Sequence, residues 1–151
     1  MKQILFTTVC NDEYAPGGHV MLYSMKKHIK GFEALCDVKV FWNKKIAPLS
    51  ALNRKKFQNI SSNVTFECVD ENKYYDAKLK NNRAEGCKAA YLALESFKEY
   101  DYDRVIMFDT DMLWVANTCP LCEFSDDQFK ADMTMRGMNT GFVVINKKCR
   151  T

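Results

Sequence analysis

A short, nearly all apolar run at residues 104–108, followed directly by Asp109-Thr110-Asp111, is the feature that most constrains the fold of this chain. A nearly all apolar strand is typical of a parallel sheet covered on both faces. Further strand-like runs occupy residues 4–9, 37–42, 64–69 and 141–145. Apolar residues at helical spacing predict helices at residues 20–29, 50–58 and 83–100, the second with Ser50 as its N-cap. This alternation predicts an α/β fold with a mostly parallel, Rossmann-like sheet flanked by helices.

Length and composition favour one globular domain spanning residues 1–151. The chain is 47% hydrophobic and 27% charged, a balance that argues against disorder. The net charge of +3 is small, and we expect the basic clusters at residues 26–27, 44–45 and 54–56 to be solvated faces. A nucleic-acid partner is therefore not expected. No apolar run approaches the roughly 20 residues of a membrane span.

The seven cysteines are odd in number and scattered, which argues against a disulfide framework. We expect no signal peptide, because the first residues run straight into a strand-like segment. Free thiols in a reducing, cytoplasmic setting fit this pattern best. The pair Cys119 and Cys122 has no second ligand pair at zinc-site spacing, so a metal role is not expected for it. A redox role is not expected either, because a redox pair normally lies at the start of a helix after a strand.

The pair Asp109 and Asp111 is the strongest chemical signal in the sequence. Residues i and i+2 of an extended segment point to the same side, so both carboxylates can reach one site. Two such charges repel each other unless a cation lies between them, and hard oxygen ligands suit Mg²⁺ or Mn²⁺. A diphosphate bridged by that metal becomes a better leaving group. The alternative is a solvated loop after the strand.

Two further segments carry residues that can bind a ligand. After the first strand, Tyr14 can stack on a nucleobase, Asn11 can hydrogen-bond its edge, and backbone groups near Thr8 can contact it. In the alternative, Tyr14 covers the core and Asn11 stabilises the turn. Farther along, Asn139-Thr140-Gly141 is a small polar entrance to a strand that lets a ligand approach the backbone, or is simply a turn.

Together these three segments resemble the glycogenin and bacterial galactosyltransferase family of glycosyltransferases, which have the GT-A fold. The family typically has a first strand followed by Thr-x-x-Asn-Asp-x-Tyr-x-x-Gly, then an apolar strand ending in Asp-x-Asp, then Asn-Ser/Ala-Gly. Here the matching segments are residues 11–17, 109–113 and 139–141. We also note a resemblance to short proteins of large DNA viruses that decorate capsid glycans.

The resemblance implies a role for each matching residue. Asp109 and Asp111 would bind Mn²⁺ (or Mg²⁺) and through it the diphosphate, with Asp109 also near the ribose or sugar. The residues implied to line the base and ribose pocket are Thr8, Cys10, Asn11 and Tyr14. The residues implied to contact the donor sugar or phosphate are Asn139, Gly141 and one of two basic candidates, Arg83 or Lys88.

The family's later His-x-x-Gly-x-x-Lys segment has no match, because the only histidines are His19 and His28. We therefore expect an incomplete acceptor half. The expected activity is metal-dependent, retaining transfer of a hexose from a nucleotide-diphosphate donor such as a UDP-sugar to a glycan or protein. The alternatives are a non-catalytic nucleotide-sugar-binding module or inactive fragment, and a nucleotidyltransferase. The last is disfavoured because residues 16–18 are a poor match to a glycine-rich phosphate loop.

Overall fold

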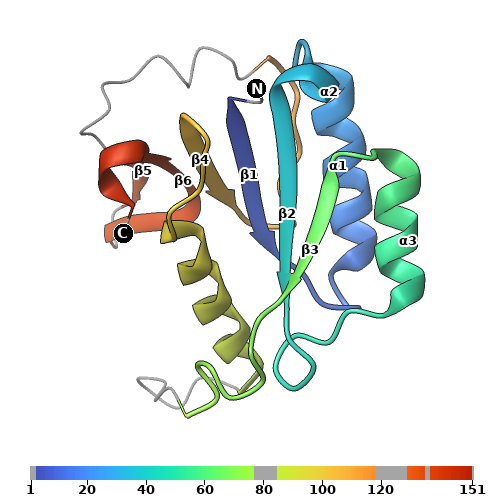
Figure 1. Ribbon diagram of the computed structural model, residues 1–151, viewed down its shortest axis with the longest axis vertical. Coiled ribbons are helices and arrows are strands. Elements are labelled where there is room, and N and C mark those ends of the chain that lie inside the picture. Colours follow the sequence, from blue (N-terminus) through green and yellow to red (C-terminus); the bar gives the residue numbers. More distant parts are fainter. Residues whose placement is uncertain (1–2, 77–84, 118–128, 135–136, 151) are drawn as a thin grey trace.

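The computed structural model describes residues 3–76, 85–117, 129–134 and 137–150. They form one six-stranded sheet in the order β3-β2-β1-β4-β6-β5 (Figure 1). Strands β1 to β4 are mutually parallel, whereas β6 is antiparallel to β4 and β5 is antiparallel to β6. The predicted α/β fold with a mostly parallel sheet is therefore confirmed. The strands are β1 (Ile4–Val9), β2 (Cys36–Trp42), β3 (Val64–Cys68), β4 (Arg104–Phe108), β5 (Phe129–Thr134) and β6 (Gly137–Asn146).

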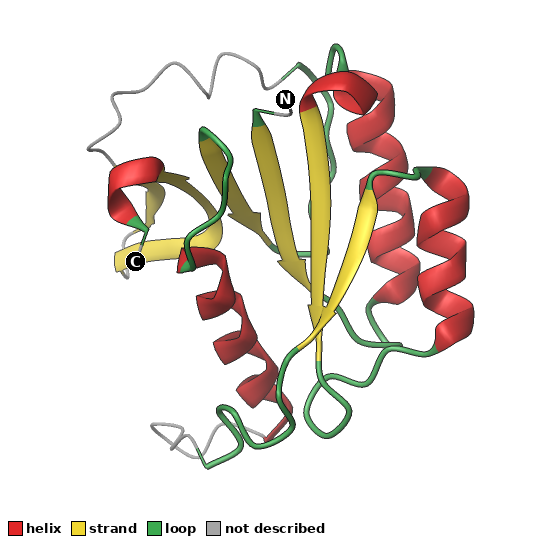
Figure 2. Cartoon of the chain, viewed as in Figure 1, coloured by secondary structure: helices red, strands yellow, loops and turns green. Residues whose placement is uncertain are grey.

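Helices cover both faces of the sheet, as Figure 2 shows. One face carries α1 (Ala15–His28) and α3 (Ala51–Ile60), with the short α2 (Phe32–Leu35) before β2. The other face carries the 3₁₀ helix η2 (Glu85–Phe97), and η4 (Lys147–Cys149) follows β6. Because both faces are covered, the parallel strands can be apolar at every position.

The central strand β1 divides the core into two layers. Phe6 faces α1, and its ring packs edge-on against Phe108 and Trp114, with centroids 5.9 Å away in both cases. Leu5 faces the opposite layer, among buried residues of β4 and β6. Thr7 points the same way and donates from Oγ1 to Ser96 Oγ of η2 at 2.8 Å, which ties this helix to the sheet.

Several boundaries agree with the sequence predictions. β1 and β4 begin and end where predicted, and Ser50 is the N-cap of α3, because its Oγ accepts from Asn53 N at 3.3 Å. The predicted helix at residues 20–29 instead begins at Ala15, five residues earlier. Pro16 suits the first turn of a helix, since its missing N–H would have no helical partner there.

The carboxyl-terminal part of the sheet departs most from prediction. β5 was not predicted, and β6 begins at Gly137, so Asn139-Thr140-Gly141 lies inside a strand and not at its entrance. The helix predicted at residues 83–100 is a 3₁₀ helix where it is described. Among the described residues, no helix combines the length and apolar character needed to cross a membrane.

Candidate functional site

The acidic pair lies at the carboxyl end of β4. Thr110 is only 8% exposed and turns inward, whereas Asp109 and Asp111 on either side of it are both exposed. Partial burial raises the pKa of Asp109, and the neighbouring negative charge of Asp111 raises that pKa further. The two carboxylates are thus close enough to interact, as their i, i+2 spacing predicts.

β6 and α1 both lie against the segment that carries the acidic pair. Asp109 N donates to Gly141 O of β6 at 2.9 Å. Gly17, in the first turn of α1, lies so close that a Cβ on it would be 3.4 Å from Thr110 O. The amino-terminal end of α1 therefore lies beside the pair, and the positive end of the helix dipole favours negative charge there.

Gly141 lies in an irregular part of β6. The pairing of β5 with β6 passes from Ala131 opposite Val143 to Asp132 opposite Asn139, so residues 140–142 bulge relative to β5. Such a bulge bends the strand and often lies next to a functional site. Here it places the backbone of β6 against Asp109, whose N–H donates to Gly141 O.

The segment after the acidic pair folds back along α1. Trp114 N donates to Ser24 Oγ at 3.0 Å, and Lys30 N donates to Asn117 Oδ1 at 3.2 Å. The Trp114 ring is buried among core aromatic residues and packs edge-on against Phe108 at 4.9 Å. These contacts fix the turn that carries the two carboxylates. No local pattern around Ser24 signals this anchoring contact, because it depends on a residue far away in the chain.

The loop between β1 and α1 is also fixed by side chains. Asn11 Oδ1 accepts from Tyr14 N at 2.9 Å, so Asn11 does stabilise the turn. Asp12 Oδ1 accepts from Ser50 N and Asn53 Nδ2, both at 2.8 Å, and these bonds lower the pKa of Asp12. The Tyr14 side chain is 55% exposed, so it does not cover the core. A fixed loop that presents an exposed aromatic ring is suited to stacking on a flat ligand.

Two predicted pocket residues lie beneath this loop. Thr8 and Cys10 are both buried, and the Thr8 hydroxyl has no hydrogen-bond partner among the described residues. Cys10 Sγ donates to Asn11 O at 3.3 Å, and burial, with the nearby charge of Asp12, raises the pKa of this thiol to about 12. Neither side chain reaches the solvent-exposed surface, so contact with a ligand in solution would have to come through the backbone.

Of the basic candidates for contact with the donor, the structure describes Lys88 but not Arg83. Lys88, near the start of η2, donates from Nζ to Tyr75 O at 3.0 Å, and its Nζ lies 5.2 Å from the centre of the Tyr75 ring. Arg83 and the side chain of Asn139 lie outside the described residues. His19 of α1 packs against Phe57 of α3, with ring centroids 4.3 Å apart.

The donor set at the acidic pair fits a hard divalent cation. Asp109 and Asp111 offer carboxylate oxygens, which Mg²⁺ and Mn²⁺ prefer, and such ions commonly keep several water ligands and bind phosphate. Within the described parts of the chain, no group of three histidine, cysteine or acidic residues surrounds one point. Asp109 and Asp111 are therefore the candidate protein ligands for such a cation.

Several glycosyltransferases of solved structure have the same architecture. The galactosyltransferase LgtC, in complex with donor and acceptor sugar analogues, superposes with a TM-score of 0.72 at 18% identity, over 95% of this chain and 58% of that one. The bifunctional glycosyltransferase WbbM gives 0.69 at 17% identity, over 97% and 32%. The glycosyltransferase GlyE of Streptococcus pneumoniae TIGR4 gives 0.65 at 12% identity, over 98% and 35%.

The chain has the GT-A fold. At these identities the likeness concerns the fold, and the chain spans between about a third and three fifths of the length of these structures. No protein-family model and no curated protein matches the sequence. The GT-A fold agrees with the resemblance drawn from residues 11–17, 109–113 and 139–141.

Proposed function

We propose that this protein is a metal-dependent glycosyltransferase that takes a sugar from a nucleotide-diphosphate donor, a UDP-sugar, and transfers it to a glycan or protein. The observation that carries the proposal is the exposed pair Asp109 and Asp111, placed beside the amino-terminal end of α1 in a GT-A fold. A carboxylate pair that can hold a divalent cation and a helix end that attracts anions together suit a diphosphate.

In this proposal each element of the site has one task. The exposed ring of Tyr14 stacks on the nucleobase, and the bulged backbone around Gly141 lets the donor sugar lie close to Asp109. Asp109 and Asp111 hold Mn²⁺ or Mg²⁺, which would neutralise charge on the departing diphosphate. The bond between the sugar's anomeric carbon and the diphosphate breaks, and an acceptor oxygen, which loses its proton, forms the new bond. Retention of configuration is proposed from the family resemblance.

Calorimetric titration of nucleotide sugars with and without Mn²⁺ tests donor binding. We expect Mn²⁺-dependent binding of at least one UDP-sugar, weakened more than about tenfold in Asp109→Asn and in Asp111→Asn, because each change removes one metal-ligand charge. The matched control is Asp101→Asn, an exposed carboxylate in the turn before β4, and it should bind as the unchanged protein does. No binding to any nucleotide sugar would contradict the proposal.

Turnover separates the enzyme from a binding module. The module is the second candidate, because the described part of the chain shows no group of three histidine, cysteine or acidic residues that could add a third protein ligand to the pair. Mn²⁺-dependent release of the nucleotide from the same donor, lost in both aspartate variants, supports the transferase. Tight binding without nucleotide release or transfer to any offered glycan would overturn the transferase in favour of the module.

A further inference from the structure

Two basic clusters that are separate in the sequence lie on neighbouring helices. Helices α1 and α3 pack side by side, with the His19 ring against Phe57 and Lys26 Nζ donating to Ile60 O at 2.9 Å (Figure 1). Neither helix contains an acidic residue. The helical layer therefore concentrates positive charge on one side of a molecule whose net charge is only +3. Its five cations are Lys26, Lys27, Arg54, Lys55 and Lys56.

Two of these cations have partners within the fold. Lys26 Nζ pairs with Glu33 Oε1 at 2.9 Å, and the Arg54 guanidinium lies over the Trp42 ring, 4.3 Å from its centre. The other three are exposed and make no ion pair or hydrogen bond within the described residues. They are Lys27, Lys55 and Lys56.

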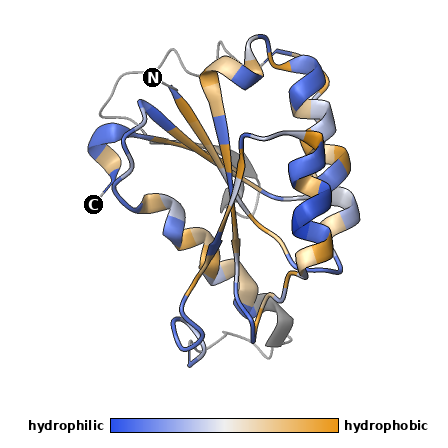
Figure 3. Ribbon diagram, turned by 45° about the vertical axis from the view of Figure 1, so that its right-hand side comes forward, coloured by the Kyte–Doolittle hydropathy of each residue, from blue (hydrophilic) through white to orange (hydrophobic). Residues whose placement is uncertain are grey.

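Large apolar side chains are exposed beside these lysines. On α1, Val20 is 59% exposed and Tyr23 is 64% exposed, and both share the outward face with Lys27, because positions i, i+3 and i+7 of a helix align. On α3, Leu52 is 65% exposed and lies one turn before Lys56. Figure 3 shows hydrophilic and hydrophobic turns together on this helical layer. We call Val20, Tyr23, Lys27, Leu52, Lys55 and Lys56 the basic face.

The two halves of the basic face are close to each other. His19 Nε2 on α1 lies 3.3 Å from Asn53 O on α3, one helical turn before Lys56, so Lys56 lies near α1. Burial lowers the pKa of His19, and the positive charge of Lys56 lowers it further. On the other side of α1, the segment that contacts Gly17 and Ser24 exposes Leu113 and Val115. Val20 lies on the same side of α1 as these two contacts, so the apolar surface continues onto that segment.

We propose that the basic face is a docking surface for an anionic phospholipid membrane. Lysines attract anionic headgroups, while aliphatic and tyrosine side chains enter the interfacial layer beneath them. Charge complementarity selects an anionic partner, because α1 and α3 carry no carboxylate of their own. The exposed aliphatic residues favour lipid over nucleic acid, since Val20 and Leu52 have no polar group with which to bind a phosphate or a base.

Co-sedimentation with vesicles tests this surface. Vesicles of phosphatidylcholine with about one third phosphatidylserine should bind the protein, and phosphatidylcholine alone should bind it far less. The triple variant Lys27→Gln, Lys55→Gln, Lys56→Gln should bind the anionic vesicles about 100-fold more weakly, since each lysine near such a surface contributes about a fivefold factor. The double variant Val20→Ser, Leu52→Ser should also bind them more weakly at unchanged charge.

A matched control removes three lysines elsewhere. Lys44→Gln, Lys147→Gln, Lys148→Gln has the same net charge as the triple variant, with all three positions exposed and off these helices. If the control lost vesicle binding equally, only net charge would matter and the proposal would fail. It would also fail if the protein bound RNA or DNA but no vesicles, or if Val20→Ser, Leu52→Ser bound anionic vesicles unchanged.

The membrane proposal is independent of the proposed donor chemistry. All positions changed here are exposed and lie outside the acidic pair, and circular dichroism should confirm that each variant is folded. Vesicle binding is measured without nucleotide or metal, and donor binding without vesicles. Failure of one measurement therefore leaves the other to be decided on its own result.

Discussion

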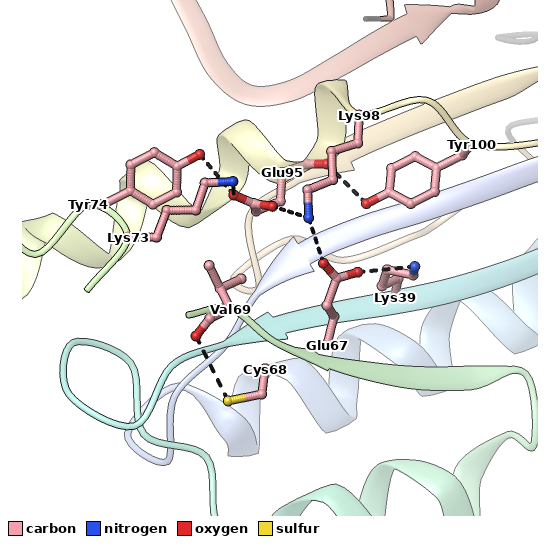
Figure 4. A network of polar contacts seen from close by, with 9 residues as sticks. All are labelled: Lys39, Glu67, Cys68, Val69, Lys73, Tyr74, Glu95, Lys98 and Tyr100. Carbon is pink, nitrogen blue, oxygen red and sulfur yellow. Dashed lines mark hydrogen bonds and ion pairs between the residues drawn. The ribbon is translucent and has the colours of Figure 1, made fainter. Parts of the chain in front are cut away.

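At the scale of single residues, Glu95 is a buried carboxylate on the η2 side of the sheet that pairs with two lysines. The Glu95 side chain is 1% exposed, and its Oε1 accepts from Tyr74 Oη at 2.8 Å and from Lys73 Nζ at 2.6 Å. Lys98 pairs with its second oxygen and also with Glu67, at 2.8 Å (Figure 4). These contacts tie η2 to β3 and to the loop that follows it.

The Glu95 network predicts a dependence of stability on pH. Burial alone would raise the pKa of Glu95, but hydrogen bonds from Lys73, Lys98 and Tyr74 outweigh it and lower that pKa. A lowered folded-state pKa means that the charged group stabilises the fold above its unfolded pKa of about 4.3. That contribution is lost as the pH falls through the lowered folded-state value.

We therefore expect Glu95→Gln to lower the free energy of unfolding by about 2 kcal/mol at pH 7, because two lysines lose their charged acceptor. The difference from the unchanged protein should shrink as the pH falls below about 4. Urea unfolding at several pH values measures it, with the exposed Glu99→Gln as control. A difference that grew in acid would contradict this account of the network.

At the scale of elements, helix α1 is shaped by two consecutive glycines with different surroundings. A Cβ on Gly18 would lie 2.6 Å from Cζ of the buried Phe57 ring, and 3.6 Å from Cys10 Sγ. A Cβ on Gly17 would meet only Thr110 O, at an ordinary 3.4 Å. Gly18 thus allows α1 and α3 to pack closely, whereas Gly17 leaves room for a methyl group.

This contrast predicts opposite effects of the same substitution. Gly18→Ala should lower the free energy of unfolding by about 1–3 kcal/mol, because overpacking exceeds the gain of about 1 kcal/mol in helix propensity. Gly17→Ala should be neutral or slightly stabilising, since it gains propensity without a clash. Thermal and urea unfolding of both variants measure the difference. Equal effects at the two positions would show that the packing against Phe57 is not limiting.

At the scale of the whole molecule, the reactivity of buried cysteines shows whether the parallel sheet opens as one unit. Cys10 follows β1 and Cys36 begins β2, and both are buried, whereas Cys68 at the end of β3 is exposed. Burial also raises the pKa of Cys10 to about 12, so its reactive thiolate is scarce in the native state. Modification of Cys10 and Cys36 therefore requires the parallel sheet to open.

We expect a maleimide to label Cys68 rapidly in the native protein, while Cys10 and Cys36 react together and much more slowly. Their common rate should rise with urea in step with global unfolding, because β1 and β2 are adjacent central strands. Peptide mapping by mass spectrometry separates the three sites. Rapid native labelling of Cys10 would show that the loop between β1 and α1 opens without the rest of the sheet.

The sequence by itself determined the features that depend on neighbouring residues. The bounds of β1 and β4, the Ser50 cap and the common exposure of Asp109 and Asp111 follow from side-chain periodicity and local hydrogen bonding. The fold class follows as well, because alternating strands and helices have few ways to cover both faces of a sheet. Donor binding, the metal and the roles of the candidate residues stay predictions.

Only the tertiary structure decided the features that depend on residues far apart in the chain. It extended α1 back to Ala15, placed Asn139-Thr140-Gly141 inside β6 and gathered lysines from α1 and α3 on one face. It also placed Ser24 against the backbone of Trp114, 90 residues away. None of these has a local signal, because each depends on which surfaces the folded sheet brings together. The acidic pair came from the sequence, and its setting beside α1 and β6 came from the fold.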